Sequence, residues 1–478
     1  MIEKENILNN NDKKIISWLS SLSDDFWDFK TNDTKELTHG FHSYPATMIY
    51  PISRNIIKKV QSLYNVDTLF DPFSGSGTVP VEGMVAGVKN IYATDLNPLS
   101  IFLTEVKTTS IENTILDHYY ELIKAKIENL FINYQSIFNK LNLFIKNNDI
   151  DISEAKGWGD SAFIILNTFF KEENIKFEIP NFKNMGYWFK PTVILKVQLI
   201  KNILSEIVDS DIKNFYMLIL SETIRVVSNK RNGEFKMYRI EKDKLIKFDP
   251  DVKNIFLNTL EINSNKMKIF NKYFENSTKP NVNVSLEDTR DLKNIPNNSV
   301  DLIVTSPPYG DSKTTVAYGE FSKLSLQWID IKNKNIDITK IDKELLGGKK
   351  INNEDKYNLN SPTLEISLKK IENIDIKRSK EVFSFYNDLD KCIYQCSNKS
   401  KKDSYQFWVV GNRTVKDTYL ETDKILVELS KKYGMIHVTT FTRNIHNKVM
   451  PSLNSPSNKK GKKNTTMTNE FIVVLRRE

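Results

Sequence analysis

The segment Val66-Asp-Thr-Leu-Phe-Asp-Pro-Phe-Ser-Gly-Ser-Gly-Thr78 decides the fold of this chain of 478 residues. Its first part, Val66–Phe70, is a short apolar run typical of a buried strand, and Asp71–Thr78 is a turn with two glycines. The next residues, Val79–Ala86, have helical character, and a second apolar run follows at Ile91–Thr94. A strand, a tight turn, a helix and a second strand predict a βαβ unit with parallel strands. We therefore expect an α/β fold with a doubly wound, mostly parallel sheet.

The remaining strands are expected after a long interruption. Apolar runs predict them at Val282–Val284, Val300–Val304, Phe407–Val410, Ile436–Phe441 and Phe471–Leu475. Residues 110–280 contain almost no glycine and show long stretches of helical periodicity, so we expect a large, mostly helical insertion there. The chain divides into an N-terminal arm (1–40), the first half of the α/β domain (41–109), the insertion (110–280) and a second half (281–478) with a polar, loop-like insertion (311–375).

Composition excludes several classes of protein. The 68 Lys and Arg residues exceed the 60 Asp and Glu residues by eight, and no apolar stretch approaches the ~20 residues that cross a bilayer. The N-terminus is polar and lacks the apolar core of a secretion signal, so we expect a cytoplasmic protein without membrane contact. Cys392 and Cys396 have no second cysteine pair, and the five histidines lack metal-ligand spacing. We therefore predict neither a disulfide framework nor a metal site.

The turn after the first strand has the features of a ligand site. Gly75 and Gly77 allow a sharp turn and close approach to a ligand, toward which the amides of the next helix point. A dinucleotide-binding turn would need a third glycine where this chain has Pro80. Asp95, after the second strand, can accept hydrogen bonds from ribose hydroxyls. The pattern indicates a ligand with a ribose but no pyrophosphate; the alternative is an ordinary tight turn between strand and helix.

A second motif, Thr305-Ser-Pro-Pro-Tyr-Gly310, follows the strand predicted at Val300–Val304. Consecutive prolines lack N–H donors and have a fixed φ, so they end the strand in a rigid corner. The carbonyl groups left at this corner, together with Ser306, can accept hydrogen bonds from an amino group, and Tyr309 offers a flat face to a planar ring. The alternative is a simple turn with a packed tyrosine. However, both motifs lie at the carboxyl ends of parallel strands, where such folds bind ligands.

These segments resemble the S-adenosylmethionine-dependent DNA methyltransferases that modify exocyclic amino groups, which have the class I methyltransferase fold. FSGSG at 73–77 is similar to the cofactor motif of that family, and TSPPY at 305–309 to its catalytic motif. HSYPA at 42–46 resembles the segment that lines the methionine side of the cofactor. Asp288 follows a predicted strand, where the family places an acidic residue near the adenine ring. The insertion matches nothing in the family.

The resemblance implies S-adenosyl-L-methionine as the cofactor, with 41–109 as the cofactor-binding half of a split catalytic domain. It assigns to the cofactor site Tyr44, Pro45, Ala46, Asp71, Pro72, Phe73, Ser74, Gly75, Gly77, Thr78, Asp95, Leu96, Asp288, Thr289 and Thr305. It assigns to catalysis Ser306, Pro307, Pro308 and Tyr309.

The implied reaction is methyl transfer to an exocyclic amino group of DNA. The amino lone pair of cytosine or adenine is delocalised into the ring. Hydrogen bonds from the amino group to Ser306 and to the Pro307 carbonyl would restore its nucleophilicity and aim it at the methyl carbon. The base must leave the duplex to reach the pocket, where Tyr309 would stack on it. Methylation at cytosine C5 would instead require a cysteine after a proline, and neither cysteine follows one.

Within the family, Ser before Pro-Pro is more usual for enzymes that methylate cytosine N4, and Asp or Asn for those that methylate adenine N6. We therefore favour cytosine N4 and keep adenine N6 as the first alternative. Further alternatives are methylation of RNA or of a protein, and a DNA-binding regulator with a relic cofactor pocket. The family's usual setting implies double-stranded DNA as a partner and a restriction–modification system with a cognate restriction endonuclease.

Two clusters of basic residues, at 225–244 and 443–463, carry much of the positive charge. Such clusters neutralise phosphates and give salt-dependent affinity for DNA, although a charge run is often only a solvated face. The candidate DNA-binding residues are Lys230, Arg231, Lys236, Arg239, Arg443 and Lys448. The helical insertion is the first candidate for target recognition, and the polar stretch 311–375 is the second.

Overall fold

The computed structural model contains a seven-stranded sheet with the order β3-β2-β1-β4-β5-β11-β8. It describes residues 8–231, 236–275, 278–311, 315–329, 331, 337–349, 358–445, 453–454, 464–465 and 469–478. The strands are β1 (Thr68–Asp71), β2 (Asn90–Asp95), β3 (Asn281–Leu286), β4 (Val300–Thr305), β5 (Ser400–Val410), β8 (Met435–Asn444) and β11 (Asn469–Arg477).

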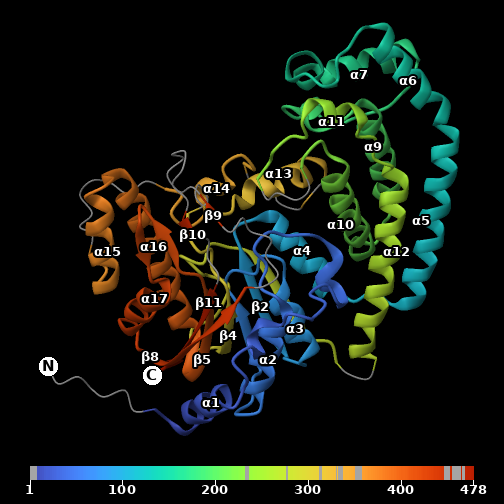
Figure 1. Cartoon of the computed structure of the whole chain (residues 1–478). Helices are drawn as coiled ribbons and strands as arrows, with labels where there is room; N and C mark the ends of the chain where they lie inside the picture. Colours follow the sequence, from blue (N-terminus) through green and yellow to red (C-terminus); the bar gives the residue numbers. More distant parts are fainter. Residues whose placement is uncertain are drawn as a thin grey trace.

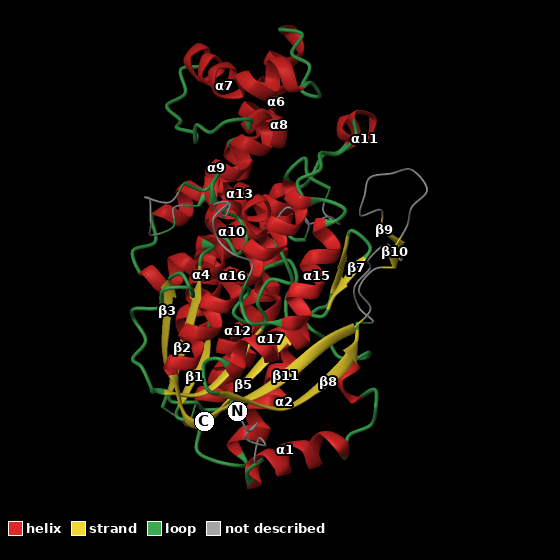
Figure 2. Cartoon of the chain, turned by 90° about the vertical axis from the view of Figure 1, so that its left-hand side faces the viewer, coloured by secondary structure: helices red, strands yellow, loops and turns green. Residues whose placement is uncertain are grey.

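The strands β3, β2, β1, β4 and β5 run parallel, whereas β11 is antiparallel to both of its neighbours, β5 and β8. Figure 2 shows the sheet in the lower part of the molecule, with β3 and β8 at its two edges. The chain order reverses between β1 and β4, so their carboxyl ends flank the crevice where open α/β sheets bind ligands.

Helices cover both faces of the sheet, because alternate strand residues point to opposite sides. Leu69 and Leu302 belong to one hydrophobic core, which includes residues of α2 (Tyr50–Gln61), α3 (Thr78–Val85) and α4 (Pro98–Thr108). Phe70 and Ile303 belong to the core on the other face, with α16 (Ile376–Lys399) and α17 (Thr422–Lys431). The prediction of a doubly wound, mostly parallel α/β fold is therefore confirmed.

The helical insertion between β2 and β3 is also confirmed. After α4 the chain forms α5 (Asn113–Asn133), α6 (Gln135–Asn147), α7 (Asp160–Glu172), α8 (Met185–Trp188), α9 (Pro191–Ser205), α10 (Ser210–Val227), α11 (Lys242–Lys247) and α12 (Val252–Asn271). Figure 1 shows α5, α9 and α12 side by side, extending away from the sheet. Helix α10 packs on α9 and α12 and also on α4, which joins the insertion to the α/β layers.

The polar stretch 311–375 differs from its loop-like prediction. Its described part includes α13 (Tyr318–Trp328), α14 (Ile341–Glu344) and α15 (Pro362–Glu372). In α13 the apolar residues Phe321, Leu324 and Trp328 follow a helical spacing and are buried. The abundance of Lys, Asn and Asp in the surrounding sequence outweighed this short pattern in the prediction.

The N-terminal segment packs closely on the last strand. Helix α1 (Asn10–Ser20) carries the buried Asp12, whose carboxylate lies 3.0 Å from the Arg476 guanidinium of β11. Cys392 and Cys396 are both buried in α16. Within the described residues, no helix is long and apolar enough to span a bilayer, and no three His, Cys, Asp or Glu side chains gather as metal ligands.

Candidate active site

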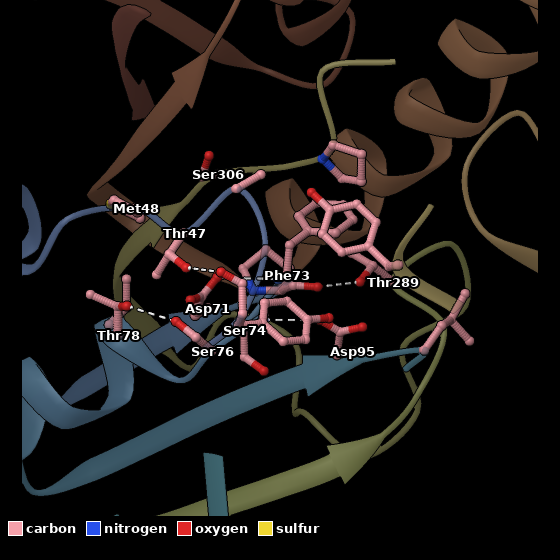
Figure 3. A pocket seen from close by; sticks show the side chains of 18 of the residues that line it. Thr47, Met48, Asp71, Phe73, Ser74, Ser76, Thr78, Asp95, Thr289 and Ser306 are labelled. Atoms are coloured by element: carbon pink, nitrogen blue, oxygen red, sulfur yellow. Dashed lines mark hydrogen bonds between the residues drawn. The ribbon is translucent and has the colours of Figure 1, made fainter. Parts of the chain in front are cut away.

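A pocket lies at the carboxyl ends of β1, β2 and β4 and contains about 790 Å³ of space, including its open mouth. Figure 3 shows Ser306 at its upper edge and Asp95 at its lower edge. Its walls contain the predicted residues Tyr44, Pro45, Ala46, Asp71, Pro72, Phe73, Ser74, Gly75, Thr78, Asp95, Leu96, Asp288, Thr289, Ser306 and Pro308.

The glycine turn that follows β1 forms one wall of the pocket. Gly75 and Gly77 have φ values of +50° and +78°, a region that L side chains rarely adopt. Gly77 does not line the pocket, and a Cβ there would lie 3.0 Å from the backbone of Thr104 in α4. Its role is therefore to let the turn pack on α4 so that α3 begins directly below the pocket.

Asp95 links the turn to the end of β2. Its carboxylate accepts hydrogen bonds from the Gly75 amide (2.9 Å), the Ser100 hydroxyl (2.8 Å) and the Asn97 amide (2.8 Å). Burial raises the pKa of Asp95, while these hydrogen bonds act in the opposite direction. Asp95 also lines the pocket, so its carboxylate lies where a ligand hydroxyl would meet it.

Asp71 ends β1 and presents a second buried carboxyl group to the pocket. It accepts hydrogen bonds from the Thr305 hydroxyl (2.7 Å) and the Phe73 amide (3.1 Å). Burial raises the pKa of Asp71 to about 7, although both hydrogen bonds lower it. Thr305, predicted to bind the cofactor, is fully buried behind the pocket and holds Asp71 instead of lining the wall.

The segment 42–46 is fixed from two sides. The Tyr44 hydroxyl accepts a hydrogen bond from the Asn97 side chain (3.0 Å), and the Tyr44 ring stacks on Tyr318 of α13 at 5.9 Å. On the other side, His42 lies 2.8 Å from the Ser221 hydroxyl. Ser43 donates from its amide and its hydroxyl to Glu222 of α10, at 3.2 and 3.1 Å. The helical insertion thus holds one wall of the pocket.

Asp288 and Thr289 follow β3 and close the pocket on the far side. The Thr289 hydroxyl donates to the Pro72 carbonyl at 2.6 Å, which ties this segment to the glycine turn. The Asp288 carboxylate pairs with Arg290 at 2.7 Å and remains partly exposed.

The TSPPY motif brings Ser306 and Pro308 to the pocket wall, whereas Pro307 and Tyr309 are not among the residues that line it. Ser306 donates a hydrogen bond to the Tyr309 hydroxyl (3.3 Å), which in turn donates to the Glu470 carboxylate (3.0 Å). Burial, followed by the charge of Glu470, raises the pKa of Tyr309 well above its usual value. A second, more open cleft shares Tyr44, Thr47 and Thr78 with the pocket and extends to Glu470.

Sequence reasoning missed several residues of the pocket walls: Thr47, Met48, Ser76, Val79, Tyr318, Leu345 and Leu346. Ser76 lies inside the motif FSGSG (73–77), and Thr47, Met48 and Val79 follow the predicted motifs within two residues, so extending each motif by two residues would have found these three. Tyr318 and the two leucines belong to the stretch expected to be a polar insertion, and no local signal marks them.

The candidate DNA-binding residues differ in how far they are exposed. Lys230 is buried with its ammonium 4.8 Å from the Phe321 ring centre, and the half-buried Arg239 donates to the backbone carbonyls of Tyr187 and Ser153. Arg443 is buried, lies 3.0 Å from Glu470 and lines the second, more open cleft. Arg231 is exposed and Lys236 half-exposed, while Lys448 lies outside the described residues.

The chemistry of the walls fits a cofactor with positive charge and no phosphate. Among the described residues, the walls contain the acidic groups Asp71, Asp95 and Asp288 but no Lys, Arg or His. A phosphate ligand would be repelled by such a site, whereas the sulfonium and ammonium groups of S-adenosylmethionine suit it. The sheet order, the glycine turn and this pocket define a class I methyltransferase that uses S-adenosylmethionine.

Comparison with known proteins extends this conclusion. The chain is 39% identical over 482 residues to the type II methyltransferase M.MvaI of Kocuria varians, and the match covers 98% of both chains. It is 26% identical over 233 residues to the type II methyltransferase M.MjaII of Methanocaldococcus jannaschii, covering 42% of this chain and 43% of that protein. No protein-family model matches.

A solved structure, the rRNA methyltransferase aviRa from Streptomyces viridochromogenes, aligns over 91% of this chain and 88% of the aviRa chain, with 8% sequence identity and a TM-score of 0.29. The match to the Kocuria protein, in contrast, spans nearly the whole of both sequences. The chain therefore belongs to the type II DNA methyltransferases, and S-adenosylmethionine is its methyl donor.

Proposed function

We propose that this enzyme methylates the exocyclic N4 of a cytosine that is flipped out of duplex DNA. The observation that carries the proposal is Ser306, a hydroxyl at the carboxyl end of β4 on the wall of the cofactor pocket. It precedes two prolines that hold the corner rigidly, so an amino group bound there would face the cofactor.

The chain's own residues supply orientation. The Ser306 hydroxyl and the Pro307 carbonyl would accept the two N–H bonds of the amino group and so restore its lone pair. Asp95 would hold the ribose hydroxyls of the cofactor, and Asp71 would face its positive charge. When bound, S-adenosylmethionine would supply an activated methyl group on its sulfonium, and the amino nitrogen that accepts this group would release one of its two protons to solvent. Because Cys392 and Cys396 are both buried in α16, away from the pocket walls, no thiol contributes to this scheme.

We assign the DNA to the more open cleft beside the pocket. It borders the TSPPY motif through Glu470 and the insertion through Glu222 and Arg225. The helical insertion is our candidate for target recognition, because helix α10 forms part of the wall of this cleft. Arg231 and Lys236 stay as candidate phosphate contacts.

Product analysis tests the proposal. The purified enzyme is incubated with duplex DNA and labelled S-adenosylmethionine, and the DNA is digested to nucleosides for chromatography and mass spectrometry. We expect N4-methylcytosine, separated from its C5 isomer by retention time, and no product from Ser306→Ala. N6-methyladenine would establish the alternative base, and methylation of RNA or protein but not of DNA would refute the proposal.

We also propose a restriction–modification setting, in which a cognate endonuclease cuts the same sequence when it is unmethylated. Sequencing of DNA from cells that express only this chain gives the modified sequence. DNA carrying that modification should resist a nuclease of the same specificity, and cleavage of fully modified DNA would contradict the pairing.

A further inference from the structure

Glu470 is a buried carboxylate directly behind the catalytic motif. It lies on β11, opposite Arg443 of β8, and its side chain is 8% exposed. One carboxylate oxygen accepts a hydrogen bond from the Tyr309 hydroxyl at 3.0 Å, and the other lies 3.0 Å from the Arg443 guanidinium. Nothing in the motif itself identifies this residue, because it is 161 positions from Tyr309.

The hydrogen bonds that join Ser306, Tyr309 and Glu470 can run in only one direction. A carboxylate accepts hydrogen bonds and cannot donate, so the Tyr309 proton points to Glu470. The Tyr309 oxygen then accepts the proton of Ser306. With its own proton used, Ser306 can present only lone pairs to a base in the pocket. The longer link, 3.3 Å between Ser306 and Tyr309, is common in sites without substrate.

We propose that Glu470 is a positioning residue that makes Ser306 a hydrogen-bond acceptor and thereby selects an amino group over a carbonyl oxygen at the target base. This inference rests on the proposed function. Cytosine offers N4–H donors at that position, whereas uracil offers the acceptor O4. An acceptor facing O4 leaves two buried acceptors in contact, which costs binding. Glu470 therefore contributes to the choice of base without touching it.

Glu470→Gln is the sharpest test, because Arg443 decides how the new amide is oriented. The guanidinium only donates, so it holds the amide oxygen toward itself and leaves the amide NH₂ facing Tyr309. That NH₂ donates to the Tyr309 oxygen, and the tyrosine proton is then directed to Ser306. The hydrogen-bond chain is reversed, and Ser306 presents a proton to the base.

The measurement is the ratio of dissociation constants for two duplexes that differ only at the target, cytosine or uracil, each opposite an abasic site so that pairing is equal. Product analysis supplies the surrounding sequence. We expect the wild type to prefer cytosine about tenfold or more, and Glu470→Gln to lose or reverse this preference. The single-turnover rate on cytosine should fall, with the affinity for S-adenosylmethionine unchanged. An unchanged cytosine-to-uracil ratio in Glu470→Gln would overturn the inference.

Tyr309→Phe keeps the ring and removes the link. In that background, adding Glu470→Gln should change neither the base preference nor the rate further, because the two residues act in series. An equal additional loss in the double variant would assign Glu470 a structural role only and overturn the inference.

Asp12→Asn is the matched control. Asp12 of α1 forms another buried ion pair with β11, through Arg476, and the variant removes one charge from that pair. It should lower the melting temperature but leave the base preference intact; a loss of preference in this control as well would also count against Glu470. If the wild type forms no amino-methylated base, the proposed function fails. If it forms one while Glu470→Gln behaves as wild type, only this inference fails.

Discussion

The Asp71 carboxyl group is buried and lies on the wall of the pocket that holds a positively charged cofactor. With a pKa of about 7, it is largely protonated below neutral pH in the cofactor-free enzyme. The cofactor's positive charge favours the ionised form, so binding releases a proton. Affinity for S-adenosylmethionine should therefore weaken as the pH falls below about 7, by up to about tenfold per pH unit.

Calorimetry in buffers of different ionisation enthalpy measures the proton released. Asp71→Asn should abolish the pH dependence, and Asp67→Asn, an exposed neighbour at the other end of β1, should retain it. The same pH dependence in Asp71→Asn as in the wild type would refute this assignment.

The sequence predicted those pocket residues that lie within a short motif. Asp71, Gly75 and Asp95 were identifiable because a glycine turn after a strand has a fixed geometry. Glu470 and Tyr318 were not, since each reaches the site by folding of distant segments. The burial of Lys230 and Arg443 was not predicted, because a charge in a sequence does not reveal whether it packs against a ring or a carboxylate.

Among the secondary-structure elements, the contact between segment 42–46 and helix α10 controls one wall of the pocket. Glu222 accepts hydrogen bonds from the Ser43 amide and hydroxyl and from Arg225, the last at 2.6 Å. In Glu222→Gln these charge-assisted bonds are lost, so the segment carrying Tyr44 is held less firmly. We expect affinity for S-adenosylmethionine to fall about five- to thirtyfold.

Glu206→Gln is the control, because Glu206 forms an exposed pair with Lys126 in the same insertion and such pairs contribute little. Calorimetric titration of both variants with S-adenosylmethionine measures the two affinities. Equal affinities in Glu222→Gln and Glu206→Gln would show that α10 does not hold the cofactor wall.

The extents of the elements were predicted less well than their existence. Strand β5 begins at Ser400, although its predicted apolar part begins only at Phe407. Three of the earlier residues, Ser400, Tyr405 and Gln406, already pair with β4, because strand pairing needs only backbone groups. Helix α13 was not predicted, because its apolar positions are few and lie within a polar stretch.

The whole molecule carries a net charge of +8, and two residues of its first basic cluster, Lys230 and Arg239, make contacts within the fold. Among the other described residues of that cluster, Arg231, Lys242 and Lys244 are exposed and Lys236 is half-exposed. Arg231 and Lys236 are the candidate phosphate contacts. If they contact phosphates, Arg231→Ala combined with Lys236→Ala should reduce the slope of log affinity against log salt concentration by up to about two.

Lys89→Ala is the control, because Lys89 is 72% exposed and lies just before β2, at the amino ends of the parallel strands and so opposite the pocket. Affinity for DNA is measured at several salt concentrations. A slope equal to that of the wild type in the double variant would remove both residues from the interface.

Helical periodicity and the lack of glycine predicted the insertion. The contacts of α10 with α4 and α13 were not predicted, because packing between distant helices depends on tertiary structure. The order of the strands was not predicted either. The two motifs indicated only that both of their strands end on the ligand-binding side, and the structure places these strands, β1 and β4, next to each other at the reversal of the sheet.

The position of β11 has a consequence for how the enzyme is made. It follows every other strand of the seven-stranded sheet in the chain, yet it lies between β5 and β8. During translation, β8 leaves the ribosome before its pairing partner exists, and the sheet cannot close until residue 477 has been added. A newly made chain therefore cannot complete its sheet before β11 has left the ribosome, and until then β5 and β8 lack the strand that joins them.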